Sequence, residues 1–183
     1  MPLKGHKPGT LLALLTKSYA ALIGSAPERW EHELEKWRDY DREAFENPET
    51  VGACVFITHL DGLVIGFGSW DPRRWPETGV VGHNCILPGF RARGHGKRQI
   101  REILGRFRSA KFKKAEVSTG EHPFYIPAQR MYKACGFIET GRKAGHLGFR
   151  MIEYELVFQV RVTRGGIHPR RQTRPHLPAV IGR

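Results

Sequence analysis

The sequence predicts one α/β domain in which helices flank a mixed, mostly antiparallel central sheet. Three observations support this fold class. Residues 10–46 show helical periodicity, residues 51–87 show strand-like alternation, and strand and helix patterns alternate after them. A chain of 183 residues with 40% hydrophobic residues is long enough to bury a substantial core. We place the domain at residues 1–160, followed by a tail at residues 161–183.

Two helices open the domain. Apolar residues recur at helical spacing over residues 10–24. A second helix should begin at Ser25, because Ser25 and Glu28 have the spacing of a capping box, and it should end before Pro48. Its apolar face would consist of Trp30, Leu34, Trp37 and Ala44.

Three strand patterns follow the helices. Residues 51–58 and 63–70 flank Asp61 and Gly62, a dipeptide typical of a tight hairpin turn. A third strand pattern covers residues 80–87. These segments predict the antiparallel part of the sheet.

The second half of the domain alternates helices and strands. A helix follows the third strand, then a short strand at residues 115–119, and then a helix at residues 127–136 that should stop at Gly136. The helix that follows the third strand has an apolar face formed by Ile100, Ile103, Leu104 and Phe107. A long final strand has an apolar face formed by Ile152, Tyr154, Leu156 and Phe158.

Charge is distributed unevenly along the chain. The net charge is +12, and residues 159–183 contain six arginines and no acidic residue. Such a tail can bind nucleic acid or act only as a solvated extension, and we favour the extension. Residues 26–50 instead hold nine of the 18 acidic residues against four Lys and Arg.

The cysteines and the hydropathy indicate the protein class. Cys54, Cys85 and Cys135 are scattered and form no CxxC pair, which argues against a zinc site or a disulfide framework and favours a reducing compartment. No apolar run approaches the roughly 18 residues that a membrane helix needs. We therefore expect a cytoplasmic protein that uses neither metal nor membrane.

The segment RARGHGKRQI at residues 91–100 has the character of a phosphate-binding loop. Glycines let backbone N–H groups approach an anion, and the start of the following helix adds its dipole. The dinucleotide pattern GxGxxG fails because Gln99 stands at its third glycine, and the Walker spacing is also absent. The phosphate therefore belongs to another ligand class.

Two motifs identify that class by resemblance. The loop reads R-x-x-G-x-G from Arg91 to Gly96, and a second motif reads A-x-x-x-Y-x-x-x-G-F from Ala128 to Phe137. Together, at this spacing, they resemble the GNAT N-acetyltransferase superfamily over residues 51–158. The resemblance implies a GNAT-like fold and acetyl-CoA as co-substrate. It implies cofactor contacts from Ile86, Leu87, Arg91, Ala92, Arg93, Gly94, His95, Gly96 and Lys97. The guanidinium of Arg91 could pair with a phosphate as a bidentate donor, and a solvated position on the surface is the alternative.

The chain departs from the family pattern at two points. The family often has Asn seven residues before the motif tyrosine, where this chain has Tyr125. The family's first strand is also not evident before the first helix. The first departure means that a contact to the pantetheine arm of the cofactor can differ from that in the family. The second leaves the N-terminal edge of the sheet unpredicted.

The resemblance also implies catalytic roles. Tyr132 stands at the family's general acid, which would protonate the leaving thiolate, and backbone N–H groups near Ile86 and Leu87 would stabilise the oxyanion. His83 stands where many members of the family have a glutamate that acts as the general base. An imidazole can also accept a proton at neutral pH. There are three alternatives to His83 as the general base. Asn84 could orient a water, Glu121 or His122 could accept the proton, or an ordered water chain could do so without a single base. We expect the side chain of His95 to face solvent or a CoA phosphate.

The acceptor is expected to be a primary amine attacked in a ternary complex. The acidic segment at residues 26–50 lies where the family shapes its acceptor site, and it would attract a cationic small molecule or peptide. The same acids would also suit an ordinary solvated helix face. A non-catalytic CoA-binding regulator and an RNA-directed acetyltransferase that uses the basic tail are the rival functions. A homodimer is compatible with the sequence.

Overall fold

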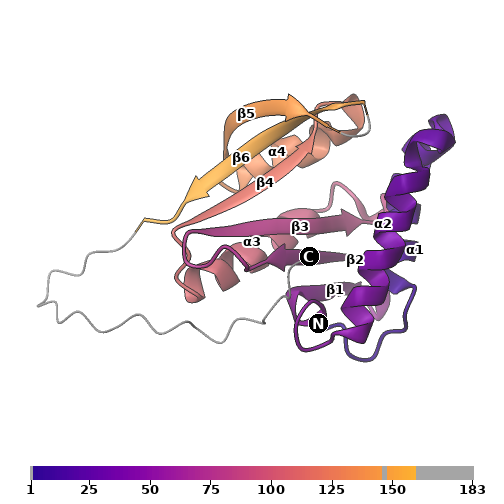
Figure 1. Ribbon diagram of the computed structural model, residues 1–183, viewed down its shortest axis with the longest axis horizontal. Coiled ribbons are helices and arrows are strands. Elements are labelled where there is room, and N and C mark those ends of the chain that lie inside the picture. Colours follow the sequence, from indigo (N-terminus) through magenta and orange to yellow (C-terminus); the bar gives the residue numbers. More distant parts are fainter. Residues whose placement is uncertain (1, 146–147, 160–183) are drawn as a thin grey trace, which may run out of the picture.

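The computed structural model describes residues 2–145 and 148–159, which form one six-stranded mixed sheet (Figure 1). The strand order is β1-β2-β3-β4-β6-β5, and only the β3–β4 pair is parallel. The predicted fold class is therefore confirmed, whereas the basic tail at residues 161–183 lies outside the described residues. The strands are β1 (Val55–Leu60), β2 (Leu63–Asp71), β3 (Thr78–Ile86), β4 (Lys114–Gly120), β5 (Ile138–Ala144) and β6 (Arg150–Val157).

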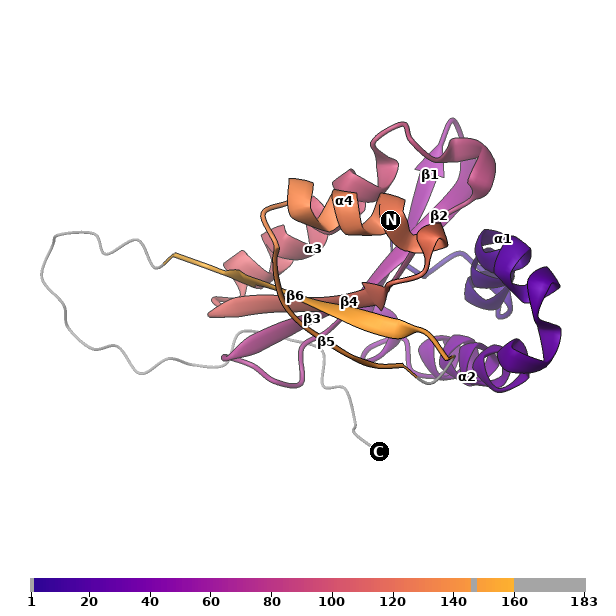
Figure 2. The ribbon, with the colours of Figure 1, turned by 90° about the horizontal axis from the view of Figure 1, so that it is seen from above.

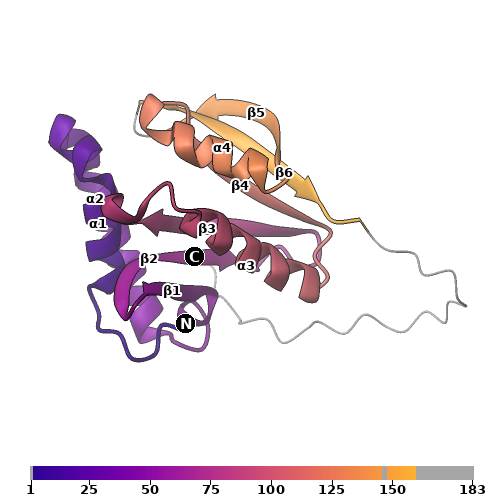
Figure 3. The same ribbon diagram turned by 180° about the vertical axis from the view of Figure 1, so that it is seen from behind.

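Helices cover the sheet unequally. Helices α3 (His95–Ser109) and α4 (Ile126–Ala134) lie on one face, which Figure 3 presents. Helix α2 (Pro27–Glu46) lies on the opposite side, and α1 (Thr10–Ser25) contacts β2 and β3 beside it (Figure 2). Each of these helices in the described part of the chain is too short or too polar to span a membrane.

The alternation of strand residues divides the interior into two cores. Phe56 and Trp70 join the core under α3, whereas Ile57 and Phe67 join the core under α1 and α2. The apolar face predicted for the third helix is buried as expected, at Ile100, Ile103, Leu104 and Phe107. So are Trp30, Trp37 and Ala44 of the second helix, while Leu34 is half-buried.

The predicted capping box between the first two helices is wrong. The Ser25 hydroxyl donates to the Leu22 carbonyl at 2.8 Å, and α2 begins after Ala26 without a side-chain cap. A carboxylate from α2 instead caps the N-terminus of α1. Asp41 of α2 is buried and accepts hydrogen bonds from the N–H groups of Gly9, Leu11 and Leu12 at 2.5, 2.7 and 3.2 Å. The start of α1 is thus fixed by a residue from the next helix.

The start of the first strand and the presence of one further strand also differ from the sequence predictions. The first strand begins at Val55, because Gly52–Cys54 form a 3₁₀ turn. Strand β5 was not predicted, since nearly all of its residues are exposed and it lacks an apolar face. Before α1 the chain makes one isolated antiparallel bridge, between Pro2 and Phe56, in place of a full strand.

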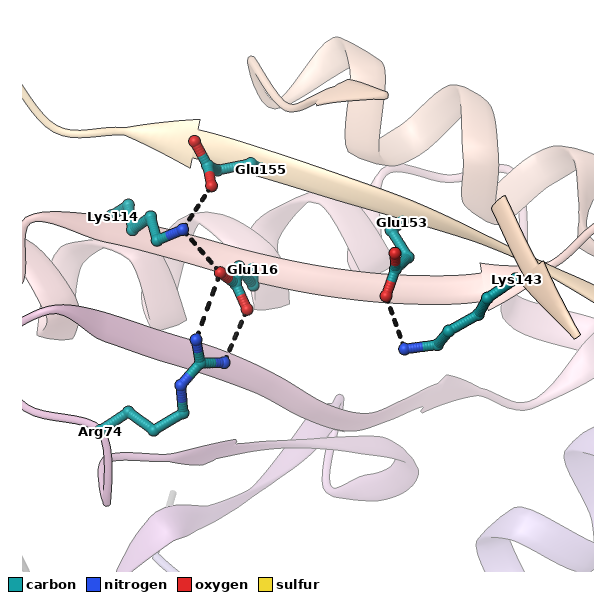
Figure 4. A network of polar contacts seen from close by, with 6 residues as sticks. All are labelled: Arg74, Lys114, Glu116, Lys143, Glu153 and Glu155. Atoms are coloured by element: carbon teal, nitrogen blue, oxygen red, sulfur yellow. Dashed lines mark hydrogen bonds and ion pairs between the residues drawn. The ribbon is translucent and has the colours of Figure 1, made fainter. Parts of the chain in front are cut away.

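Ion pairs line the solvent-facing side of β4, β6 and β5 (Figure 4). Lys114 lies between Glu116 and Glu155, with N–O distances of 2.8 and 2.6 Å. Lys143 of β5 contacts Glu153 of β6 at 2.5 Å. Each exposed pair contributes little, about 0–1 kcal/mol. Along β4 and β6 the paired residues alternate with buried ones, as expected for a sheet with one face toward solvent.

The sheet opens between β3 and β4. Their parallel pairing joins Thr78, Gly79 and Val80 to Lys114–Glu116 and stops there. Strand β3 nevertheless stays paired with β2 as far as Ile86, and β4 stays paired with β6 as far as Gly120. The second half of β3 therefore presents its backbone to the space beside β4.

Candidate functional site

Two cavities meet where β3 and β4 diverge. The first, of about 350 Å³, lies between the end of β3, the start of α3, α1 and α4. The second, of about 180 Å³, lies between α2, the middle of β3, the end of β4 and α4. Both cavities are lined by Tyr19, Asn84, Tyr125 and Ala128. These four residues therefore lie between the two neighbouring cavities.

The first cavity is bounded by the loop that precedes α3. Ala92 and Gly94 have φ angles of 59° and 83°, so this turn runs through the left-handed region that favours glycine. Helix α3 begins directly after Gly94 without a side-chain cap. The first N–H groups of a helix have no partner within it, and the helix dipole adds positive charge there. This arrangement suits an anion such as a phosphate.

Most of the predicted cofactor contacts lie around this cavity. Leu87 does not line it and packs against the core beneath α1 and α2, and Arg93 lies exposed on the loop outside it. His95 is buried in the cavity wall, so of its two predicted environments the solvent does not apply, and contact with a CoA phosphate stays a prediction. The predicted residues that line the cavity are Ile86, Arg91, Ala92, Gly94, His95, Gly96 and Lys97.

Arg91 is held by the protein itself. Its Nε donates to the Ile86 carbonyl at 3.0 Å and its Nη2 donates to the Ser18 carbonyl at 2.5 Å. The guanidinium also lies 5.5 Å from the ring centroid of Phe124. The side chain thus joins the loop to both β3 and α1 through two of its five N–H groups, and its predicted contact with a phosphate stays a prediction.

Tyr132 lies in the second cavity. It is buried on α4, and its ring centroid is 6.0 Å from that of Tyr154 and 5.9 Å from that of Phe137. Burial raises the pKa of the Tyr132 phenol well above its usual value. The hydroxyl therefore keeps its proton at neutral pH and can act as a hydrogen-bond donor.

His83 lines the same cavity from β3. Its carbonyl accepts a hydrogen bond from Ser69 Oγ at 3.1 Å, and its half-buried ring lies against Tyr40 of α2. Burial lowers the pKa of the His83 imidazole below its usual value, and the negative charge of Glu33 partly opposes this shift. The imidazole is therefore neutral at neutral pH, as a proton acceptor must be.

The other predicted base candidates lie outside both cavities. Glu121 pairs with Arg142, and its second oxygen lies 3.7 Å from Nε of Arg150. Nδ1 of His122 accepts a hydrogen bond from the Phe124 N–H at 3.2 Å. Asn84, in contrast, lines both cavities.

Aromatic residues form much of the second cavity, which sequence reasoning missed. Trp30 and Trp37 fit the helical apolar face, a pattern that does not distinguish a core from a cavity wall. Tyr125, at the position where the family often has Asn, packs its ring over Gly120, where a Cβ would lie 2.5 Å from Tyr125 Cε2. Glu33 is the only member of the acidic segment among the described residues lining this cavity.

No group of three or more His, Cys, Asp or Glu within residues 2–145 and 148–159 is placed to hold a metal ion.

The comparisons with known proteins agree with this geometry. No curated protein sequence matches the chain. Solved structures with the same fold include PH1933 from Pyrococcus horikoshii OT3, with a TM-score of 0.65 and 16% identity over 87% of this chain and 96% of that one. A protein of Desulfovibrio desulfuricans, described as a GNAT-family acetyltransferase, gives a TM-score of 0.61 and 18% identity over 82% and 94% of the two chains.

A third solved structure contains a ligand. The yncA protein of Salmonella typhimurium, solved with acetyl-CoA as its cofactor, gives a TM-score of 0.50 and 15% identity over 62% of this chain and 69% of that one. In addition, the model of the acetyltransferase (GNAT) family matches residues 16–137, which is more than half of the sequence. The chain therefore belongs to the GNAT family of acetyltransferases.

Proposed function

We propose that this protein transfers the acetyl group of acetyl-CoA to a primary amine by direct attack in a ternary complex. The observation that carries the proposal is the junction of the two cavities at Tyr19, Asn84, Tyr125 and Ala128. A donor in one cavity and an acceptor in the other would meet at this junction, as a direct transfer requires. The free cysteines fit the reducing cytoplasm in which we place the protein.

Acetyl-CoA would occupy the first cavity. Its pyrophosphate fits the N-terminus of α3, where Gly94, Gly96 and Lys97 line the wall. Lys97 and the exposed Arg93 supply positive charge, while Arg91 holds the loop in place. The unpaired half of β3 offers backbone N–H groups near Ile86 to the thioester carbonyl. Acetyl-CoA in related folds such as the Salmonella protein supports this placement.

The acceptor amine must lose a proton before it attacks. An alkyl ammonium has a pKa of about 10.4, so only about one molecule in a thousand is neutral at neutral pH. His83 would accept that proton in the second cavity. The amine lone pair then forms the C–N bond at the thioester carbon, the nitrogen releases its second proton to solvent, and the C–S bond breaks as CoA leaves as a thiolate.

Tyr132 would act on the leaving group. A CoA thiolate is a weaker base than a tyrosinate, so the Tyr132 hydroxyl would first stabilise the developing charge by hydrogen bonding. The proton that reaches sulfur comes from solvent or from the imidazolium of His83 and is relayed through the Tyr132 hydroxyl, so the phenol is protonated before and after the step. The overall balance is acetyl-CoA plus amine giving N-acetylated amine plus CoA thiol.

The test is thiol release from acetyl-CoA against a panel of amines, comparing Tyr132→Phe with Tyr154→Phe. Tyr154 is the matched control, because it packs beside Tyr132 but lines neither cavity. We expect Tyr132→Phe to lower kcat about a hundredfold or more with acetyl-CoA binding unchanged. Acetyl-CoA binding without thiol release for any amine would favour the regulator, and equal activity of the two variants would exclude the acid role.

A further inference from the structure

We propose that Asn84 of β3 is a catalytic residue whose side-chain Nδ2 donates a hydrogen bond to the carbonyl oxygen of the acetyl group, beside a backbone N–H of the same strand. The inference rests on the proposed function, because it concerns the thioester that the transfer would use. The contact is already made when acetyl-CoA binds, however, so it can be tested without turnover.

The Asn84 side chain lies where the two cavities meet. It lines both of them, and it belongs to the part of β3 that continues beyond the last pair with β4 at Val80. The next residue, Cys85, belongs to the core beneath α1 and α2. Successive side chains of a strand point to opposite faces, so Asn84 projects toward the face that carries α3 and α4. Its amide therefore borders the place where a donor and an acceptor would meet.

The Nδ2 atom of Asn84 is a buried donor without a hydrogen-bond partner among the described residues. A buried amide N–H that lacks a partner is unfavourable, because folding has removed its hydrogen bonds with water. Nearly all such groups in folded proteins are paired, so an unpaired donor beside a cavity indicates a ligand that would pair with it. The χ2 torsion of asparagine is soft, and a small rotation about it turns Nδ2 toward the cavity.

The other side-chain amide among the described residues of the first cavity is already engaged. Nε2 of Gln99 donates to Thr58 Oγ1 at 2.8 Å and to the Cys85 carbonyl at 3.3 Å. Both of its N–H groups therefore have acceptors within the protein. Asn84 thus carries the side-chain amide donor that stays available to a ligand in this part of the chain.

A backbone donor lies close by on the same strand. The Leu87 N–H donates to the Ile65 carbonyl of β2 at 2.8 Å, so the peptide groups of Leu87 point toward β2. These groups alternate in direction along a strand, which turns the N–H and carbonyl of Ile86 to the open side next to β4. The hydrogen bond from Arg91 Nε to the Ile86 carbonyl agrees with this direction. The Ile86 N–H and Asn84 Nδ2 therefore border the same opening.

Two donors suit the chemistry of the proposed transfer. When the amine forms the C–N bond, the π electron pair of the thioester carbonyl moves onto oxygen, and it returns when the C–S bond breaks. Donors that already point at this oxygen stabilise its negative charge without having to reorganise. The amide of Asn84 is uncharged and transfers no proton, so its contribution should not change with pH. This separates it from a residue that only orients a water for the base.

The experiment is isotope-edited infrared spectroscopy of acetyl-CoA, labelled with ¹³C at the carbonyl carbon and bound to the full chain. A hydrogen bond to the carbonyl lowers its stretching frequency. We expect a lower frequency in the parent protein than in Asn84→Leu. Thr78→Val is the matched control, because Thr78 Oγ1 is also buried on β3 without a partner among the described residues but lines neither cavity. It should leave the frequency unchanged.

Kinetics and a second variant complete the test. Asn84→Leu should lower kcat about a hundredfold at every pH, with little change in the KM for acetyl-CoA. Its Tm without ligand should not fall, because the variant removes a donor that has no partner in the described chain. Asn84→Asp covers the case in which the leucine disturbs packing. It has nearly the same shape, but its carboxylate only accepts hydrogen bonds, so the frequency shift should be lost there too.

The outcomes separate this inference from the proposed function. An unchanged frequency in both Asn84 variants overturns the inference even where acetyl transfer occurs. So does a frequency that responds to Tyr19→Phe or Tyr125→Phe instead, since these hydroxyls belong to the same junction. If the frequency depends on Asn84 but no amine releases thiol, the inference stands and the transferase proposal fails. If acetyl-CoA does not bind, both fail.

Discussion

The ring of Tyr40 on α2 lies 4.9 Å from the imidazole of His83 on β3, with the ring planes inclined at 58°. This contact excludes water from one side of the imidazole, and burial lowers the pKa of His83. Tyr40 of α2 therefore takes part in the burial that keeps His83, the base we propose, neutral. Activity below the usual histidine pKa of about 6.5 should depend on that contact.

Tyr40→Ala should expose the imidazole and raise the pKa of His83 toward its usual value. The acid limb of the kcat/KM profile would then move to higher pH, because the base stays protonated over a wider range. Tyr40→Phe keeps the ring and should leave the limb in place. The His83 resonances followed by NMR titration report the pKa directly, and an unchanged value in Tyr40→Ala would refute the desolvation argument.

His83→Ala should lower turnover more at neutral pH than at about pH 9. At the higher pH a larger fraction of the amine is already neutral, so a base is less needed. The measurement is kcat across this range with a fixed acceptor. A loss that is uniform with pH would instead indicate that His83 shapes the cavity and accepts no proton.

Arg91→Lys should destabilise the protein and raise the KM for acetyl-CoA. A lysine cannot reach the Ile86 and Ser18 carbonyls together, and two buried acceptors would lose their donor, at a cost of about 1–3 kcal/mol. The exposed Arg93 provides the contrast. Arg93→Ala should leave the Tm unchanged and weaken acetyl-CoA binding in a salt-dependent way. Equal Tm values for the two variants would contradict this division of roles.

Gly94→Ala should strain the loop, since Gly94 has a φ of 83° immediately before α3. We expect a loss of about 1 kcal/mol in stability and weaker acetyl-CoA binding, because the helix N-terminus would shift. Gly89→Ala is the control, as a Cβ there meets no atom within 4 Å and the backbone is not in the left-handed region. Thermal unfolding and acetyl-CoA titration of both variants check this expectation.

Asp41→Ala should remove the cap of α1 and cost about 1–2 kcal/mol of unfolding free energy, measured in urea. Asp39, two residues earlier, is exposed and pairs only with Arg42 among the contacts within the described residues. Asp39→Ala should therefore change stability by less than about 0.5 kcal/mol. A similar loss in both variants would mean that the cap contributes little.

Local patterns in the sequence predict much of the fold. The period of the apolar residues identifies all four α-helices of the described chain and five of its strands, because those elements bury one face. Strand β5 escapes this reasoning, since its position depends on pairing with β6 and on contacts such as Lys143 with Glu153. The cap of α1 also escapes, because Asp41 lies 30 residues from Leu11 in sequence.

The candidate site is only partly predictable for a similar reason. The loop at residues 91–96 and the motif that contains Tyr132 each have a fixed order of residue types. Their resemblance to the GNAT family therefore locates them in the sequence. The second cavity is assembled from α1, α2, β3, β4 and α4, and no short pattern connects Glu33 with His83 or Tyr132. Its aromatic wall reads in sequence as ordinary core, because burial in a core and burial around a cavity select the same side chains.

The hydrogen bond from Arg91 to the Ser18 carbonyl joins the anion-binding loop to α1. Tyr19, the next residue of that helix, belongs to the walls of both cavities. In the proposed function the two cavities hold the two substrates, so a ligand that tightens this hydrogen bond from one side would raise affinity on the other side by the same factor. Saturating one substrate would then lower the dissociation constant of the second, and Arg91→Lys should remove this dependence.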